Sequence, residues 1–191
     1  MSERNIRQVR SIASDFKTRE AGEELSIEGY FAVFNSNYDI APGMSESIAP
    51  GAFADTLSGD VRALVNHDST LVLGRTTAHT LELREDAHGL WGKIAVNPKD
   101  GDAMNLYERV KRGDVDQCSF GFDITDEETT VSDNGDVHWT IKGVNLYEVS
   151  CCTFPAYETT NISARSAERD KIKELRLDSW KETMKERIKN A

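Results

Sequence analysis

The stretch VDQCSFGFDI, residues 115–124, decides how this chain is expected to fold. Three apolar side chains alternate along it, namely Cys118, Phe120 and Phe122. An extended backbone directs such a set to one side, so Ser119 and Gly121 point to the other side. The pattern predicts a strand with an aromatic face in the core and a serine on the opposite face. An arbitrary serine in that position would simply face solvent.

Short β patterns surround this stretch. They alternate apolar and polar residues or run as brief apolar segments, and they occupy residues 24–35, 61–67, 70–76, 80–86 and 90–97. Asp68 and Ser69 separate two of these runs and predict a turn. A further strand pair ends in VNLYEVSCCTF, residues 144–154. The patterns predict a meander of short antiparallel strands, hence an α+β fold that is mainly β.

Three segments carry helical patterns. In residues 100–114 the apolar side chains fall at i, i+3, i+4 and i+7, and Gly113 ends the pattern. Pro50 could begin a short helix that turns three side chains inward, namely Ala52, Phe53 and Leu57. Residues 166–191 are half charged with apolar residues near helical spacing, which predicts a C-terminal amphipathic helix. Such a helix suits docking on a partner helix, and packing on the body of the protein is the alternative.

Composition excludes several classes of function. The 191 residues include 33 acidic and 23 basic side chains, and the formal net charge of -10 opposes binding to nucleic acid or to an anionic membrane. No apolar run approaches the length of a membrane span, and the N-terminal sequence lacks the apolar core of a signal peptide. The three cysteines form no spaced disulfide framework. We therefore expect a protein of the reducing cytoplasm.

No cofactor or metal is expected. The sequence contains no phosphate-binding loop of the Walker type and no dinucleotide fingerprint. Cys151 and Cys152 are adjacent and cannot act as a spaced pair of ligands, and no other pair of cysteines or histidines has the usual zinc spacing.

His67 and Ser119 are candidates for nucleophilic catalysis. Of the four histidines, only His67 ends a strongly apolar strand, ALVNHD. A serine nucleophile needs a neighbouring base, and an imidazole with a pKa near 6.5 suits that task. The imidazole needs an acceptor that orients it. The acidic candidates are Asp68, Asp116, Asp123 and Glu148.

Glu148 stands out among these acids because it lies inside an apolar strand. A carboxylate is costly to bury there unless other groups satisfy it. Alternation would place it on one face with Leu146 and Ser150. A strand glutamate that faces water is the alternative, and a strand-end histidine that is merely hydrogen-bonded is the alternative for His67. A cysteine nucleophile at Cys118 is a further hypothesis, although its alternation with the phenylalanines predicts an inert core thiol.

Several motifs in order resemble the prohead proteases of tailed bacteriophages, which are thought to share a fold with the herpesvirus assemblins. The motifs are ESIAPGAF (46–53), VNHDSTLVLGRT (65–76), EDAHGLW (85–91), VKRGDVDQCSFGF (110–122) and LYEVSCCTFPAY (146–157). The resemblance runs from about residue 24 to residue 165. It implies a small closed antiparallel β-barrel with surrounding helices. It also implies a serine endopeptidase that removes scaffold segments of the capsid protein, and digests itself, inside the assembling prohead in the host cytoplasm.

The resemblance also assigns roles to residues. It implies that Ser119 is the nucleophile, His67 the general base and Glu148 the orienting acid. The assemblins use a second histidine as the third member, and the Glu148 segment contains none. We expect Ser119 on the outer surface of the barrel, with Gly121 leaving room for a peptide backbone. Backbone amides or a nearby cation are expected to stabilise the oxyanion, and Arg75 is a candidate for that cation.

The expected organisation has three parts. Residues 1–23 form an N-terminal arm or a first edge strand, residues 24–165 the protease domain and residues 166–191 the appended helix. The expected partners are the capsid protein with its scaffold segment and further copies of this chain. A catalytically inactive scaffold or capsid-binding module of the same fold is the alternative.

Overall fold

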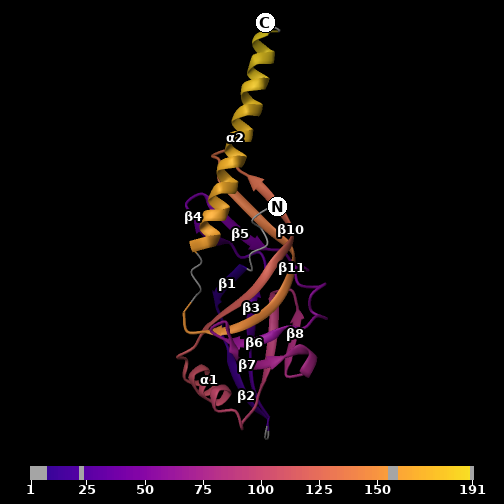
Figure 1. Ribbon diagram of the computed structural model, residues 1–191, viewed down its shortest axis with the longest axis vertical. Coiled ribbons are helices and arrows are strands. Elements are labelled where there is room, and N and C mark those ends of the chain that lie inside the picture. The colour runs from indigo at the N-terminus through magenta and orange to yellow at the C-terminus, as the bar shows by residue number, and fades with distance from the viewer. Residues whose placement is uncertain (1–7, 22–23, 155–158, 190–191) are drawn as a thin grey trace.

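Two β-sheets and two α-helices make up the computed structural model, which describes residues 8–21, 24–154 and 159–189 (Figure 1). The larger sheet has seven strands: β1 (Gln8–Ala13), β4 (Tyr38–Ala41), β5 (Met44–Ile48), β6 (Arg62–Val65), β7 (Asp68–Arg75), β10 (Gln117–Val131) and β11 (Val137–Cys152). The smaller sheet has four: β2 (Lys17–Ala21), β3 (Glu24–Val33), β8 (Leu81–Glu85) and β9 (Gly89–Val96). The helices are α1 (Gly101–Arg112), α2 (Thr159–Lys189) and the short 3₁₀ turn Thr76–Ala78.

The long β10–β11 hairpin organises the larger sheet. β1 pairs antiparallel with the outer edge of β10. The other edge of β11 pairs in parallel with β5 near its start and with β6 near its end. β11 can serve both strands because its 16 residues are far longer than either partner. The end of β11 that pairs with β6 holds the candidate site.

The core lies between the two sheets. Ile27 and Leu90 of the smaller sheet belong to the same buried cluster as Phe120 and Phe122 of the larger sheet. Phe120 stacks on Phe122 with ring centroids 4.9 Å apart. The apolar face predicted for the stretch 115–124 is therefore a core face. Burying side chains of this size supplies the main driving force of folding.

The expected closed barrel is wrong. In the described part of the chain the strands form two separate sheets, and β1, β4 and β7 are edges of the larger one. β11 pairs first with β5 and then with β6 along its length. This change of partner splits the larger sheet into two branches, so the sheet does not close. Alternation along single strands gives no information about such pairing. The resemblance to the herpesvirus fold stays a prediction.

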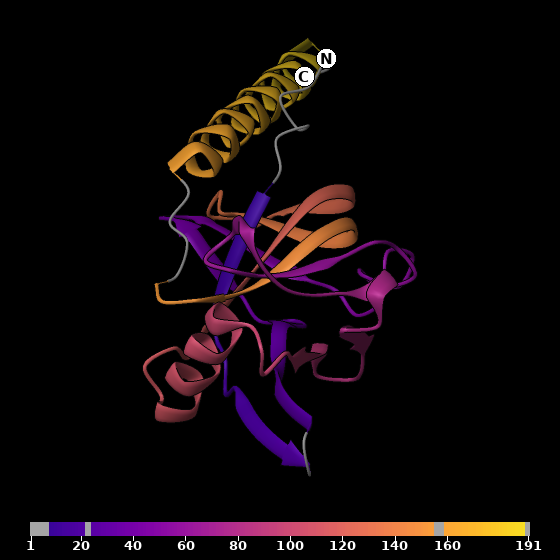
Figure 2. The same ribbon diagram turned by 60° about the horizontal axis from the view of Figure 1, so that its bottom comes forward.

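Helix α1 forms as its sequence pattern predicts. The side chain of Asp100 accepts hydrogen bonds from the backbone N–H groups of Asp102 and Ala103 at the N-terminus. Gly113 ends the helix in the left-handed conformation with φ of 82°. The four apolar side chains at helical spacing are buried: Ala103, Leu106, Tyr107 and Val110. α1 lies at the end of the molecule away from α2 (Figures 1 and 2).

The helix expected after Pro50 does not form. Residues 51–58 are a run of turns, and Gly51 adopts a positive φ of 89°. Ala52 and Phe53 are nevertheless buried, and Leu57 packs against the core, as predicted for an inward-facing set. The segment therefore fills the core without regular hydrogen bonding, which apolar spacing alone does not distinguish from a helix.

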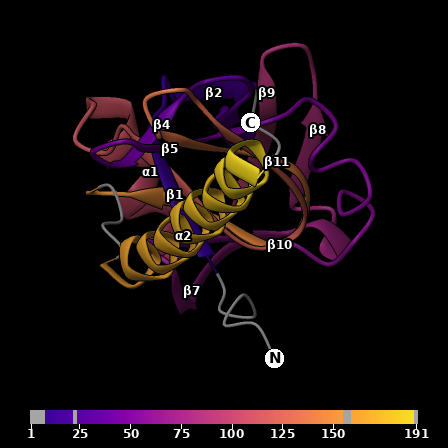
Figure 3. The same cartoon turned by 90° about the horizontal axis from the view of Figure 1, so that it is seen from above.

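Helix α2 crosses over strands of the larger sheet (Figure 3). Its buried Arg165 forms ion pairs with Glu127 (2.9 Å) and Glu46 (3.5 Å) and lies over the Trp139 ring, 4.6 Å from the centroid. Ile172 packs on the cluster of Met44, Val137 and Trp139. The C-terminal half projects beyond the sheets (Figure 1), and its large apolar side chains are exposed, namely Leu175, Leu177, Trp180 and Ile188.

Residues 8–21 of the expected N-terminal arm form β1 and β2. Arg10 of β1 is buried and holds Glu46 of β5 with two of its guanidinium nitrogens. Removing one partner of a buried ion pair typically costs about 3–5 kcal/mol, so β1 is fixed to the larger sheet. The first seven residues of the arm lie outside the described residues, as do residues 22–23.

Candidate active site

His67 lies in the tight turn between β6 and β7. Asn66 and His67 have φ values of 51° and 62°, as a two-residue turn of type I′ requires. Val65 pairs with Asp68 on either side of them. The turn therefore falls two residues earlier than the predicted Asp68 and Ser69. Asparagine tolerates the left-handed conformation well, and this tolerance is the sequence signal for the observed turn.

The His67 ring meets the Glu148 carboxylate. Nδ1 of His67 lies 2.7 Å from Oε1 of Glu148. A carboxylate only accepts hydrogen bonds, so Nδ1–H is the donor. The Glu148 side chain is 6% exposed and the His67 side chain 26% exposed. The contact therefore fixes the ring in an environment that is largely shielded from water. Nε2 is the ring nitrogen that does not contact Glu148.

Ser150 and Gly121 complete the surroundings of the Glu148 carboxylate. Ser150 Oγ donates to Oε2 of Glu148 at 2.6 Å. Gly121 is the strand partner of Glu148 on β10, and a Cβ atom there would lie 2.4 Å from Oε1. The space beside Gly121 therefore belongs to the Glu148 carboxylate. The expectation that Gly121 leaves room for a peptide backbone is wrong for this structure.

A bulge changes which residues share the face of Glu148. Ser150 lies on that face as predicted, because it is two residues along the strand. Leu146 pairs with Phe122 and belongs to the core, so its expected place beside Glu148 is wrong. The register shifts between Gly121 and Phe122, and Tyr147 is the extra residue that reverses the alternation.

Ser119 lies on the face of β10 that carries Gly121, opposite Ser150 of β11. It is fully buried, and its Oγ donates to the backbone carbonyl of Arg10 at 2.8 Å. The expected position on the outer surface is therefore wrong. The reason is that β1 covers the edge of β10, with Ser11 directly beside Ser119.

Cys152 is the other neighbour of the His67 ring. Its Sγ lies 3.8 Å from Nε2, and the side chain is buried. Burial lowers the pKa of His67, but the contacts with Cys152 and Glu148 outweigh burial and raise the pKa to about 10. At neutral pH this arrangement holds a charged His67 beside the Glu148 carboxylate.

The other acids proposed from the sequence have different partners. Asp68 accepts hydrogen bonds from the backbone and the side chain of Thr70. Asp116 accepts from the side chain of Gln117, and Asp123 accepts from the Tyr147 hydroxyl at 2.6 Å. Glu148 is thus the acid among the four that contacts His67.

Arg75 and Cys118 are also engaged elsewhere. The Arg75 guanidinium binds Asp60 through two contacts of 2.6 Å. Cys118 is fully buried, and burial raises the pKa of its thiol well above the usual value. A thiolate is therefore disfavoured at Cys118, which removes the support for that residue as a nucleophile.

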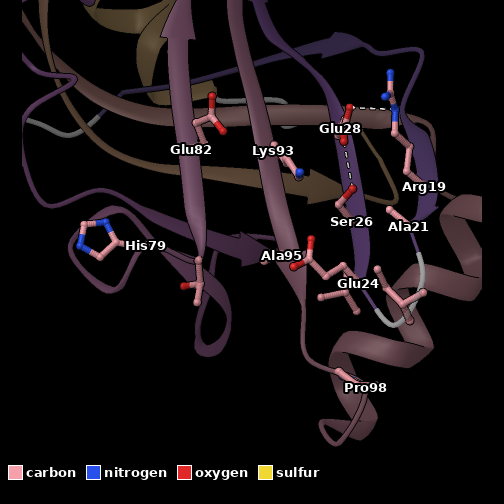
Figure 4. Close-up of a pocket in the computed structure, with 13 residues that line it drawn as sticks. Arg19, Ala21, Glu24, Ser26, Glu28, His79, Glu82, Lys93, Ala95 and Pro98 are labelled. Atoms are coloured by element: carbon pink, nitrogen blue, oxygen red, sulfur yellow. Dashed lines mark hydrogen bonds and ion pairs between the residues drawn. The ribbon is translucent and has the colours of Figure 1, made fainter.

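The described residues offer no metal-ligand set at the candidate site. Among the described residues no group of three or more histidine, cysteine or acidic side chains is arranged to hold a metal ion. An open groove crosses the smaller sheet, where Glu28 accepts from Ser26 Oγ at 3.0 Å and pairs with Arg19 at 3.1 Å (Figure 4). Its lining includes none of the three residues proposed from the sequence.

The structure thus brings His67 and Glu148 into contact and places Ser119 one strand away. Sequence reasoning missed Ser150 and Cys152 as neighbours of His67. Their signal was the period-two alternation Glu148, Ser150, Cys152, which puts all three on one face of β11. An imidazole oriented by a carboxylate beside a serine is the arrangement used in nucleophilic hydrolysis.

Comparison with known proteins identifies the family. The model of the Caudovirus prohead serine protease family matches residues 13–175. The prohead protease of Enterobacteria phage HK97 is 29% identical over 172 residues, which cover 87% of this chain and 72% of that protein. The structure of the bacteriophage T4 capsid assembly protease, gp21, has a similar fold, with a TM-score of 0.53 at 12% identity over 76% of this chain and 96% of that one. The chain belongs to the Caudovirus prohead serine protease family.

Proposed function

We propose that the protein is a serine endopeptidase that cleaves scaffold segments of the capsid protein, and itself, during maturation of a phage prohead. Ser119 is the nucleophile, His67 the general base and Glu148 the acid that orients His67. The observation that carries the proposal is the 2.7 Å contact of His67 Nδ1 with Glu148, on the sheet face that also carries Ser119. The HK97 relative, a prohead protease, supports a substrate within the assembling prohead.

Catalysis requires a change at Ser119. In the structure its hydroxyl donates to the Arg10 carbonyl, and the Ser119 side chain is fully buried. Rotation about the Cα–Cβ bond moves a serine hydroxyl between staggered positions. Ser150 accepts a hydrogen bond from the His67 backbone and is the strand partner of Ser119, so Ser119 lies near the turn that carries His67. We propose that Ser119 Oγ turns from β1 toward Nε2 of His67 in the active enzyme.

The reaction then follows the chemistry of serine proteases. Neutral His67 takes the proton from Ser119 Oγ at Nε2 while Oγ bonds to the peptide carbonyl carbon. The protonated ring gives this proton to the leaving amine as the C–N bond breaks, which leaves an acyl-enzyme. Water attacks the ester, again with His67 as base, and Ser119 regains its proton. Glu148 holds the ring through Nδ1 and stabilises its charged form throughout.

The direct test combines the purified protein with a capsid protein that carries its scaffold segment. We expect new termini within the scaffold segment, read by mass spectrometry, and labelling of Ser119 by a fluorophosphonate probe. Absence of both would favour the alternative of an inactive capsid-binding module. None of the helices in the described part of the chain has the length and apolarity of a bilayer span.

The contact between Cys152 and His67 raises a second candidate, a cysteine hydrolase built on Cys152, His67 and Glu148. Compared at a pH above the acid limb of both proteins, Cys152→Ala should retain peptidase activity within about threefold of wild type, because the thiol only neighbours Nε2 and does not attack the substrate. Peptide cleavage by this variant is the measurement. Loss of cleavage together with thiol alkylation of the wild type at Cys152 would move the nucleophile to that residue.

Truncation separates the two halves of α2. A chain that ends after Asp178 keeps Arg165, Ile172 and Arg176, the last of which donates to the Ser132 carbonyl at 3.3 Å. We expect this chain to fold and to cleave a short peptide normally, but to enter proheads poorly because it lacks the exposed residues Trp180 and Ile188.

A chain that ends after Arg165 is the matched comparison. It loses the packing of Ile172 on the cluster of the larger sheet, so its melting temperature should fall below that of the longer truncation. Normal incorporation of the chain that ends after Asp178 would show that the projecting half of α2 does not recruit the enzyme.

A further inference from the structure

Ser150 connects the two side chains that the proposed mechanism uses. Its Oγ donates to Oε2 of Glu148 at 2.6 Å and accepts a hydrogen bond from the backbone N–H of His67 at 3.2 Å. The residue is fully buried. One hydroxyl group on β11 therefore joins the Glu148 carboxylate to the turn that carries His67.

The bond to Oε2 sets which carboxylate oxygen faces the imidazole. Glu148 has two equivalent oxygens, and Oε1 is the one bound to His67. With Oε2 held by Ser150, the carboxylate plane is fixed and Oε1 points at Nδ1. Without that donor, Oε2 would lose the partner that it has among the described residues, which is unfavourable enough for a buried charged oxygen to turn the group toward another donor.

The hydrogen bond from the His67 N–H to Ser150 Oγ holds the histidine side of the His67–Glu148 contact. His67 has a left-handed backbone conformation with φ of 62°, which a residue with a Cβ atom adopts at a cost. Asn66 of the same turn donates its N–H to the Cys151 carbonyl at 3.1 Å, and the His67 N–H is anchored on Ser150 Oγ, so both turn residues are held against β11. Of these two bonds, the one to Ser150 acts on His67 itself, so the same hydroxyl contributes to the positions of the ring and of the carboxylate.

We propose that Ser150 is a positioning residue that holds Glu148 and His67 in the geometry for base catalysis. The proposal rests on the proposed function of the site and goes beyond it, because Ser150 touches neither substrate nor the proton that is transferred. Ser150 acts through Glu148 and through the backbone of His67.

The test compares Ser150→Ala with Ser14→Ala, a matched control. Ser14 is also a buried serine, and its Oγ donates to the Tyr30 carbonyl at 2.8 Å, away from the site. We expect Ser150→Ala to lower kcat about 10- to 100-fold with KM unchanged, the rate equivalent of one hydrogen bond to a charged group. Ser14→Ala should leave kcat unchanged.

Two further readouts separate positioning from a purely structural role. In proton NMR of the Ser119→Ala protein, the Nδ1–H of His67 should give a downfield resonance that is lost when Ser150→Ala is added and kept when Ser14→Ala is added. In the Glu148→Gln background, Ser150→Ala should lower kcat by a smaller factor than in the wild type, because one of the two groups through which Ser150 acts is already changed.

The outcomes are distinguishable. Full proteolytic activity of Ser119→Ala would overturn the proposed function, while the NMR readout would still test Ser150. A folded Ser150→Ala protein that keeps the downfield resonance and wild-type kcat would overturn the positioning role. If Ser150→Ala does not fold, Ser150→Cys replaces the hydroxyl with a slightly larger thiol that is a weaker donor, and it is measured in its place. Unchanged kcat and resonance in that variant would equally overturn the role.

Discussion

Ser119→Ala should abolish cleavage of the scaffold-bearing capsid protein and lower kcat/KM by about 10⁴-fold or more, as loss of a triad nucleophile does. In the proposed mechanism the Ser119 hydroxyl attacks the peptide carbonyl carbon, and no neighbouring side chain replaces it in this role. The variant should stay folded, since alanine removes one buried oxygen and adds no atom. Its loss leaves the Arg10 carbonyl without that donor, at a cost of about 1–2 kcal/mol.

The measurement pairs cleavage of the capsid protein with circular dichroism on the same preparation. Ser26→Ala is the control, because Ser26 is buried in the smaller sheet and its hydroxyl donates to Glu28 at 3.0 Å. That variant should lose a comparable hydrogen bond and keep its activity. Normal scaffold cleavage by well-folded Ser119→Ala would remove Ser119 as the nucleophile.

Local patterns in the sequence anticipate much of the fold. The alternation of Cys118 and Phe120 defines the core face of β10 because the side-chain period of a strand is two whatever its neighbours are. α1 is predictable for a similar reason, since its apolar stripe, its Asp100 cap and its Gly113 end are all encoded within 15 residues. Both features depend on residues close together in the chain.

Pairing between distant segments could not be predicted in this way. The partners of β11 change from β5 to β6 along its length, so the sheet branches and does not close. The burial of Ser119 has the same origin, because it follows from pairing of β1 with β10 across more than a hundred residues of sequence. Residues 8–13, QVRSIA, carry no regular alternation of apolar and polar side chains that would predict this pairing.

The candidate site could be predicted from the sequence only in part. A carboxylate in the apolar strand around Glu148 calls for a buried partner, and the structure supplies His67 and Ser150. The side of the strand that Leu146 occupies was not predictable, because a single bulged residue, Tyr147, reverses the alternation. Nothing in a period-two pattern marks where such a bulge falls.

His67→Ala should be nearly as damaging as Ser119→Ala, with kcat/KM again lower by about 10⁴-fold or more, since nucleophile and base act as a unit. Glu148→Gln should keep more activity, because an orienting acid contributes less than the base it orients. Both are measured on the same peptide substrate. Activity of His67→Ala near that of wild type would assign the base to another group.

The pH dependence tests the same residue without removing it. Burial alone would lower the pKa of His67, but the contacts with Cys152 and Glu148 raise this pKa to about 10. A base must be neutral, so kcat/KM should rise with pH as His67 loses its proton, and the acid limb should lie above pH 7 rather than at the usual histidine value near 6.5. Glu148→Gln removes the negative charge that favours the protonated ring, so its acid limb should move to lower pH while its maximal rate falls. An acid limb that is the same in wild type and Glu148→Gln would show that the Glu148 carboxylate does not control the base in the active enzyme.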